Sequence, residues 1–241
     1  MKMHASAIFA RASIGPGAKS RPTVTAHAGS LGTEPNGEAS FAAALGFAVD
    51  FLEADIRFTR DGRAYLSHDA LPPAEAERAM GLDELLAMVA PLPGIRLNLD
   101  LKEYSAVGAL RDLVISRGMG SRVVLTGVRL GEVPGVRAAA AGLPYFLNAE
   151  PRFLARATRA GAEAFARRVR GCGAVGLNTH KALATGLLAR ALARAGLELS
   201  VWTVDEEAEM RAILALGPDN VTTRRPDRLL ALLDSGREGT A

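Results

Sequence analysis

Short apolar segments alternate with amphipathic segments rich in Ala, Leu and Arg along most of the chain. The apolar segments are a few residues long, which favours buried strands, whereas the amphipathic segments have the periodicity of surface helices. The predicted strands are residues 23–27, 51–57, 95–101, 123–126, 145–147, 174–177, 199–204 and 220–223. The predicted helices are residues 38–46, 82–89, 106–116, 133–141, 152–170, 182–195, 206–216 and 226–233. Most of the helices end at a glycine, the usual helix C-terminal residue.

Eight strand–helix pairs in succession predict an α/β fold, a (β/α)₈ TIM barrel in a single domain. The length of 241 residues, nearly half of them hydrophobic, suits one such barrel. We expect residues 1–21 to be a flexible leader, residues 22–236 to form the barrel and residues 237–241 to be a short tail. A short polar hairpin at residues 60–63 is predicted after the second strand, because these residues favour a turn.

The balance of basic and acidic residues limits the kinds of partner that the chain is expected to bind. The chain has 29 basic and 26 acidic residues with no long basic run, and few aromatic residues, so a nucleic-acid partner is not expected. No stretch approaches the ~20 apolar residues of a transmembrane segment, and the apolar residues before Arg11 are too few for a signal-peptide core. We expect a cytoplasmic protein whose single Cys172 excludes an internal disulfide. The sequence does not indicate an oligomeric state.

Polar residues gather where two neighbouring strands end. Glu53 and Asp55 share one face of the second strand, and Asn98, Asp100 and Lys102 share one face of the third. The C-terminal ends of the strands form the active end of TIM barrels. Three carboxylates in one barrel mouth repel one another, and a single divalent cation relieves that repulsion. Oxygen ligands favour Mg²⁺ or Ca²⁺. Taken singly, each carboxylate is more typical of a solvent-facing charge.

Two histidines lie at strand ends as well. His27 ends the first strand, and His68 follows the apolar residues 64–66. Histidine titrates near neutral pH and therefore suits general acid–base catalysis, although a lone histidine is more often a surface or packed residue. Trp202 lies near the end of the seventh strand, where it either packs in the core or lines a pocket. His180 follows the predicted sixth strand, where an ordinary surface or packed histidine is the favoured interpretation and a functional role stays open.

Together these segments resemble the glycerophosphodiester phosphodiesterase family. The specific part is Glu-x-Asp-(x)₃-Thr-x-Asp-Gly at residues 53–62, followed by His-Asp at residues 68–69. Residues 26–29, 36–41, 98–102, 201–205 and 216–227 resemble further elements of the family, so the similarity spans most of residues 23–233.

This resemblance implies a metal-dependent phosphodiester hydrolase that acts on glycerophosphodiesters or related small or lipid-derived phosphodiesters. It implies that His27 and His68 are the acid–base pair, and that Lys102 is a positive group near the phosphate. It also implies that Glu53, Asp55 and Asp100 are the ligands of the divalent cation.

The chain departs from the family pattern at several positions. Ala28 stands where the family usually has Arg, Asp100 where it usually has Glu, and Arg224 where it usually has an acidic residue. Only 31 residues separate His68 from Asp100, so the family's usual insertion is largely absent and a more open site is expected. We hypothesise that Arg224 replaces the missing guanidinium, since the last strand of a closed barrel lies beside the first.

Two other functions remain open at this point. A lysophospholipase D-like or cyclising phosphodiester lyase would use the same groups, with a hydroxyl of the substrate attacking the phosphorus. A non-catalytic barrel that binds a phosphorylated ligand would explain the missing Arg. The retained histidines and carboxylates argue against this last alternative, because a pure binding protein needs no acid–base pair.

Overall fold

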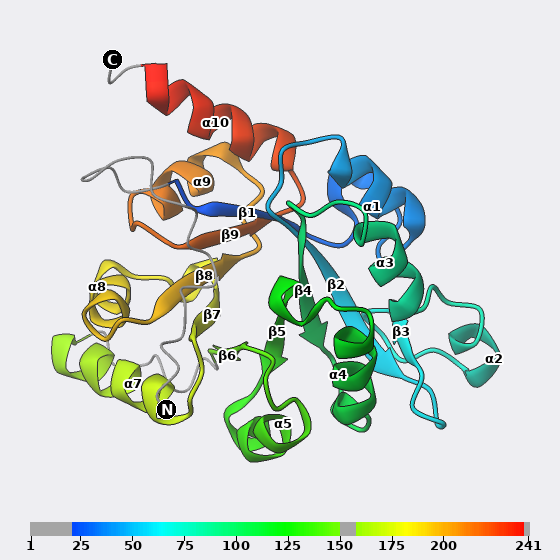
Figure 1. Ribbon diagram of the computed structural model, residues 1–241. Coiled ribbons are helices and arrows are strands. Elements are labelled where there is room, and N and C mark those ends of the chain that lie inside the picture. The colour runs from blue at the N-terminus through cyan, green and yellow to red at the C-terminus, as the bar shows by residue number, and fades with distance from the viewer. Residues whose placement is uncertain (1–20, 150–157, 239–241) are drawn as a thin grey trace.

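The computed structural model describes residues 21–149 and 158–238, and Figure 1 shows it as a barrel of strands surrounded by helices. The strands are β1 (Thr23–Ala26), β2 (Phe51–Phe58), β3 (Ala64–Leu66), β4 (Arg96–Leu101), β5 (Val123–Val128), β6 (Tyr145–Asn148), β7 (Gly176–His180), β8 (Glu198–Trp202) and β9 (Asn220–Thr223). They pair in the order β1-β9-β8-β7-β6-β5-β4-β2-β3, and pairing of β1 with β2 closes the sheet. All pairings are parallel except that of β3 with β2, so the predicted (β/α)₈ barrel is confirmed.

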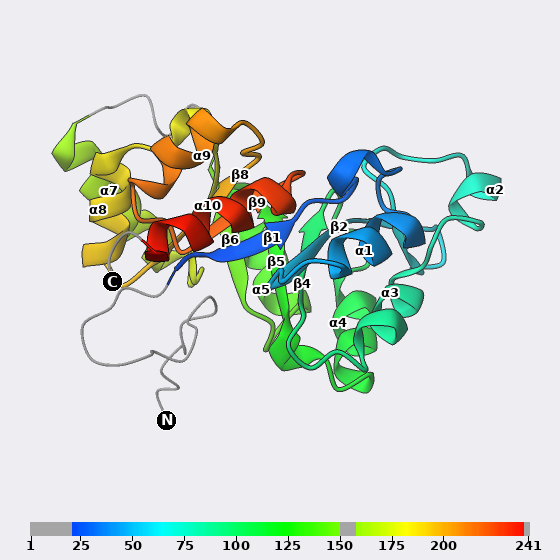
Figure 2. The same ribbon diagram turned by 90° about the horizontal axis from the view of Figure 1, so that it is seen from above.

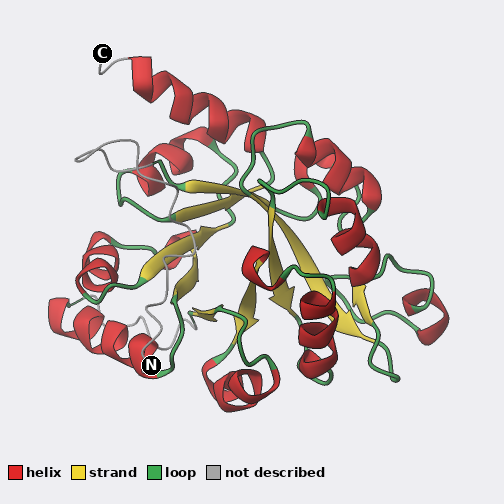
Figure 3. Cartoon of the chain, in the orientation of Figure 1, coloured by secondary structure: helices red, strands yellow, loops and turns green. Residues whose placement is uncertain are grey.

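Helices form the outer ring (Figure 3). The described α-helices are α1 (Glu38–Leu45), α2 (Pro73–Ala76), α3 (Leu82–Val89), α4 (Val107–Ser116), α5 (Val133–Ala139), α7 (Arg159–Gly171), α8 (Gly186–Arg194), α9 (Glu207–Leu214) and α10 (Pro226–Glu238). The helix α10 packs beside β1, where Figure 2 shows it along the seam of the barrel. In the part of the chain that the structure describes, no helix is long and apolar enough to cross a membrane.

Strand alternation divides the side chains into two sets. Residues such as Leu52, Leu97 and Leu177 point outward and are buried beneath the helices. The inward residues form a small apolar cluster of Phe51, Val124 and Phe146 near the start of the strands. Beyond that cluster the interior is polar and buried, with residues such as Thr25, Asn98, Ser200 and Asn220. The barrel therefore has an apolar base on the side of β2, β5 and β6, and its interior is polar from base to mouth on the side of β1 and β9.

The predicted elements differ from the observed ones in a few places. The apolar residues 64–66 form β3, a hairpin strand on β2 that is absent from the prediction, with Gly62 in the left-handed region at φ 91°. The predicted helix 182–195 begins only at Gly186, because Thr185 adopts an extended backbone and its hydroxyl caps the helix by accepting from Leu188 N.

Domain boundaries stay a prediction. Residues 1–20 of the expected leader and residues 152–157 of a predicted helix lie outside the described residues. The last helix runs to Glu238, past the start of the expected tail.

Candidate active site

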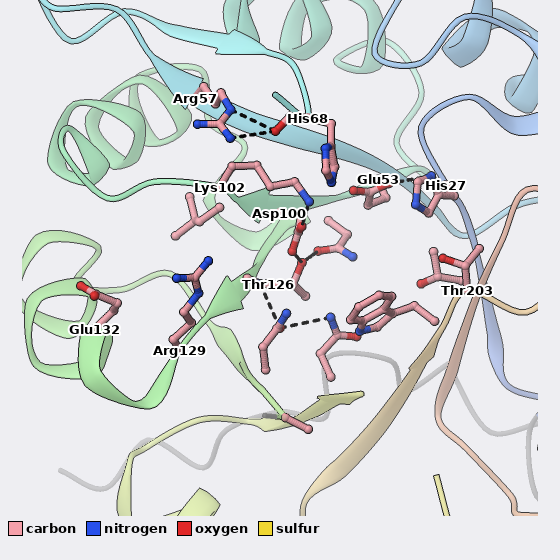
Figure 4. Close-up of a pocket in the computed structure, with 18 of the residues that line it drawn as sticks. His27, Glu53, Arg57, His68, Asp100, Lys102, Thr126, Arg129, Glu132 and Thr203 are labelled. Carbon is pink, nitrogen blue, oxygen red and sulfur yellow. Dashed lines mark hydrogen bonds and ion pairs between the residues drawn. The ribbon is translucent and has the colours of Figure 1, made fainter. Parts of the chain in front are cut away.

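Three carboxylates meet at the mouth of the barrel. Glu53 and Asp55 come from β2 and Asp100 from β4, and the strand register places Asp55 directly opposite Asp100. One oxygen from each lies within 4.8 Å of the others. Glu53 and Asp55 are buried, and Asp100 is half-buried. Figure 4 shows Glu53 and Asp100 facing the same cavity. The structure thus brings together the three residues that the sequence singled out as metal ligands.

The charges of this cluster are incompletely balanced within the protein. Lys102 Nζ lies 2.8 Å from Asp55 Oδ1 and 2.5 Å from Asp100 Oδ2. Burial opposes ionisation of Asp55, yet Lys102 and a hydrogen bond from Asn36 lower its pKa. Burial, with the charges of Asp55 and Asp100, raises the pKa of Glu53 well above its usual value. One ammonium beside three carboxylates leaves negative charge, so the donor set fits a hard divalent cation.

Asn36 holds Asp55 at two points. Its Nδ2 donates to Asp55 Oδ2 at 2.8 Å, and its Oδ1 accepts from the backbone N–H of Asp55 at 2.9 Å. The backbone of Asn36 is left-handed at φ 61°, a conformation that asparagine tolerates better than most residues. Sequence reasoning included Asn36 in the family resemblance but gave it no role. It is a positioning residue for a carboxylate of the cluster.

His27 lies directly beside the cluster. Its Nδ1 is 2.6 Å from the carbonyl oxygen of Ala28 and 3.5 Å from Glu53 Oε2. A carbonyl can only accept, so Nδ1 carries the proton and Nε2 of the neutral ring is the atom that can accept another. Burial lowers the pKa of His27, and the charge of Arg224 acts in the same direction. The backbone N–H of Ala28 donates to Glu53 Oε2 at 2.9 Å, which ties the end of β1 to β2.

His68 reaches the same cavity from the hairpin (Figure 4). The backbone N–H of Ser67 donates to Asp55 O at 3.1 Å, so β3 returns the chain to the active end of β2. Arg57 donates from Nε and a terminal nitrogen to the carbonyl oxygen of His68, at 3.0 and 2.9 Å. The His68 ring is exposed, and its Nδ1 lies 3.0 Å from the Asp69 carboxylate. Sequence reasoning missed Arg57 as a support of His68, although alternation places it on the face of Glu53 and Asp55.

The cavity has a volume of about 1150 Å³ and contains both histidines. Trp202 and Arg224 also line it. Arg224 is half-exposed, and its guanidinium lies 3.1 Å from Asp205 Oδ2, while its backbone N–H donates to the same carboxylate at 2.7 Å. The structure therefore places all eight residues singled out from the sequence at or beneath one cavity, Asp55 lying under its floor through its contacts with Lys102.

A row of neutral polar residues continues around the mouth from the carboxylate cluster, and sequence reasoning missed it. Thr126, Asn148 and Asn178 line the cavity from β5, β6 and β7. They carry no charge and belong to none of the motifs above, although the alternation of each strand would place them inward. His180, whose role the sequence left open, accepts a hydrogen bond from the backbone N–H of Ala182 through its Nδ1. Its ring meets the Trp202 ring edge-to-face, with 5.4 Å between the ring centroids.

Comparison with known proteins agrees with this geometry. Residues 99–228 match the glycerophosphoryl diester phosphodiesterase family. A protein of Mycobacterium tuberculosis (strain ATCC 25618 / H37Rv) named "Probable glycerophosphodiester phosphodiesterase 2" is 27% identical over 225 residues, covering 80% of this chain and 81% of that one.

Solved structures share the fold. One from Silicibacter pomeroyi DSS-3, described as "Putative glycerophosphoryl diester phosphodiesterase", superposes with a TM-score of 0.78 at 21% identity, covering 91% of this chain and 96% of that one. A phosphodiesterase of Oleispira antarctica in complex with the product sn-glycerol-3-phosphate gives a TM-score of 0.73 at 18% identity, covering 89% and 97%. The family match spans more than half of the chain, so the chain belongs to the glycerophosphoryl diester phosphodiesterase family and is a phosphoric diester hydrolase.

Proposed function

We propose that the protein hydrolyses glycerophosphodiesters in a reaction that depends on one divalent cation and on His27 and His68. The observation that carries the proposal is a cavity lined by His27, His68, Glu53 and Asp100, with Asp55 beneath it in the same carboxylate cluster. The Oleispira antarctica phosphodiesterase, of similar fold, binds sn-glycerol-3-phosphate as its product, which supports a glycerophosphodiester as the substrate.

Glu53, Asp55 and Asp100 would hold the cation. When bound, a divalent cation polarises a phosphoryl oxygen and stabilises negative charge on the phosphate as it reacts. The cluster offers only oxygen atoms, which suits Mg²⁺ and Ca²⁺ alike. Lys102 already contacts two of the three carboxylates, so its ammonium lies close enough to the cluster to contact a phosphate bound there.

The two histidines would transfer the protons. One imidazole takes a proton from the attacking water as the water oxygen bonds to phosphorus. The other gives a proton to the leaving oxygen as its bond to phosphorus breaks, so that a phosphomonoester and an alcohol are released. In His27 the bond from Nδ1 to Ala28 O fixes the ring, and in His68 the Asp69 carboxylate holds Nδ1. Both contacts leave Nε2 for proton transfer.

Arg224 would supply the phosphate contact that Ala28 lacks. Its guanidinium lines the cavity with His27 and Glu53, and its charge is near enough to lower the pKa of His27. Asp205 binds both its backbone and its side chain, which restricts where the guanidinium can lie. A planar guanidinium matches two phosphate oxygens at once. Trp202 lines the same cavity and would contact the substrate.

The test is divalent-dependent hydrolysis of a panel of glycerophosphodiesters with choline, ethanolamine and glycerol head groups. We expect turnover with Mg²⁺ or Ca²⁺, loss of turnover on chelation, and glycerol 3-phosphate among the products. Accumulation of a cyclic phosphate would instead identify the cyclising lyase, and release of the head group from a lysophospholipid would identify the lysophospholipase D-like activity. Turnover that survives complete chelation would contradict the proposal. The cytoplasmic location stays a prediction.

A further inference from the structure

Three polar side chains face the barrel interior away from the carboxylate cluster, one each from β6, β7 and β8. In the closed strand order, β7 lies across the barrel from β2, and β8 lies across from β4. The register pairs Asn148 with Asn178, and it pairs His180 with Trp202, so Asn178 and Trp202 lie on the same face of neighbouring strands. All three of Asn148, Asn178 and Trp202 line the cavity that holds the histidines.

The orientation of both amide groups follows from one backbone donor. The sheet register shifts at Gly127, whose backbone is left-handed at φ 75° and whose N–H donates to Asn148 Oδ1 at 3.0 Å. A Cβ at this position would lie 2.3 Å from Leu101 O, so the bend requires glycine. Asn148 Oδ1 also accepts from Asn178 Nδ2 at 3.2 Å. Because Asn148 Oδ1 can only accept, the amide atom of Asn178 that faces it must be the nitrogen. The amide atom of Asn178 that points away from Asn148 is therefore its oxygen, Oδ1.

That oxygen has no donor among the described residues. Asn178 is 5% exposed, and its Oδ1 is buried without a hydrogen bond. The Nε1–H of Trp202 is likewise buried without an acceptor among the described residues. Other inward asparagines differ: Asn98 Oδ1 accepts from Thr126, and Asn220 Oδ1 accepts from two threonine hydroxyls. Buried polar atoms without partners are rare and call for a ligand or a water molecule.

We propose that Asn178, with Asn148 and Trp202, binds a hydroxyl of the substrate's glycerol moiety and thereby selects hydroxyl-bearing phosphodiesters. A hydroxyl can donate to Asn178 Oδ1 and can accept from Trp202 Nε1–H, and glycerol phosphate carries two hydroxyls. The amide nitrogen of Asn148 has no acceptor among the described residues and is available to a second hydroxyl. This inference rests on the proposed function, which supplies the glycerol phosphate.

The position of these groups suits a phosphate held at the cluster. Thr126 Oγ1 lies 2.8 Å from Asp100 Oδ1, and the next residue, Gly127, binds Asn148. Strands in a sheet lie about 4.8 Å apart, so Asn148 on β6 is about 10 Å along the sheet from Asp100 on β4. From a phosphate beside the carboxylates, a three-carbon polyol could therefore extend toward β6 and β7. A ligand without hydroxyls would leave Asn178 Oδ1 unsatisfied.

The test compares two phosphomonoesters that differ only in their hydroxyls, sn-glycerol 3-phosphate and propyl phosphate, by titration calorimetry with Ca²⁺ present. We expect wild type to bind glycerol 3-phosphate roughly tenfold or more tightly than propyl phosphate, since a site loses about that much when a buried acceptor stays unpaired. Asn178→Leu should bring the two affinities within about threefold by weakening glycerol 3-phosphate alone. Trp202→Phe keeps an aromatic ring but removes the N–H together with the five-membered part of the indole, and it tests the proposal if Asn178→Leu does not fold.

Arg224→Ala is the matched control, because it removes a contact to the phosphate that both ligands carry and should leave the ratio of the two affinities unchanged. Equal binding of both ligands by wild type would overturn the inference and indicate that ordered water occupies the site. A ratio that survives in both Asn178→Leu and Trp202→Phe would also overturn it. Failure of diester hydrolysis with the hydroxyl preference intact would contradict the proposed function and leave the hydroxyl site standing.

Discussion

The two sides of the barrel mouth differ in how completely their buried polar groups are hydrogen-bonded within the protein. On the side of β2 and β4, charged groups are crowded, and Lys102 and Asn36 contact three of the six carboxylate oxygens. The backbone N–H of Ala28 and the hydroxyl of Thr126 contact two more. On the side of β7 and β8, Asn178 and Trp202 are neutral, and each keeps a buried polar atom without a partner in the described chain. An unsatisfied neutral group costs about 1–3 kcal/mol, whereas an unpaired buried ion costs several times more. The charged side therefore needs hydrogen bonds and Lys102 within the protein, and the negative charge that remains requires a cation, whereas the neutral side can leave single polar atoms for a ligand to satisfy.

The largest effect should come from removing a charge of the cluster. We expect Glu53→Gln and Asp55→Asn each to abolish divalent-dependent turnover and to weaken cation binding in titration calorimetry, because ligand number and charge set the affinity. Circular dichroism should show the fold retained. Asp61→Asn, in the exposed turn after β2, is the control and should keep normal turnover. Near-normal turnover by either cluster variant at limiting cation would disprove the metal site.

Substitution of the histidines should have the second-largest effect on turnover. His27→Ala and His68→Ala are expected to lower kcat by roughly 10²–10⁴-fold, the usual contribution of a general acid or base. The wild-type pH profile should be bell-shaped, and each variant should lose one limb. If both variants hydrolyse the substrate at the normal rate, the histidines are structural and the acid–base mechanism is wrong.

Asn36 tests whether the charged side depends on neutral support. Asn36→Gly keeps the left-handed backbone without strain but removes both bonds to Asp55. We expect kcat and the cation affinity each to fall roughly tenfold, because a ligating carboxylate that loses its supporting hydrogen bonds is less well positioned. Asn36→Ala should add a loss of thermal stability, because alanine disfavours this backbone. Unchanged cation affinity in Asn36→Gly would show that Lys102 alone positions Asp55.

The smallest effect should come from Arg224, which lies between the two sides. Because Asp205 holds it and it is half-exposed, Arg224→Ala should raise KM for phosphodiesters by roughly three- to tenfold with a smaller change in kcat. Arg225→Ala is the matched control, since that side chain pairs with Asp227 and does not line the cavity. Equal KM changes in the two variants would show that Arg224 acts only through general surface charge.

Much of the charged side could be predicted from sequence. Alternation along β2 and β4 places Glu53, Asp55 and Asp100 on inward faces, and the rule that barrels carry their sites at strand C-termini brings those faces together. The neutral side could not be predicted in the same way. Asn148 and Asn178 are ordinary inward polar residues in sequence, and their importance depends on which hydrogen bonds remain unmade.

The sequence by itself determined the alternation of strands and helices, and hence the closed barrel, because burial of alternate residues is a local property of each segment. It also determined which residue types reach the mouth. Tertiary structure alone decided how those residues pair: Lys102 across two carboxylates, Asn36 beneath Asp55, and Gly127 bending β5 so that its N–H sets two amides on neighbouring strands. Apart from the contact of Lys102 with Asp100, two residues away on the same strand, these contacts join segments far apart in the chain. Their geometry depends on strand register and backbone bends that periodicity does not encode.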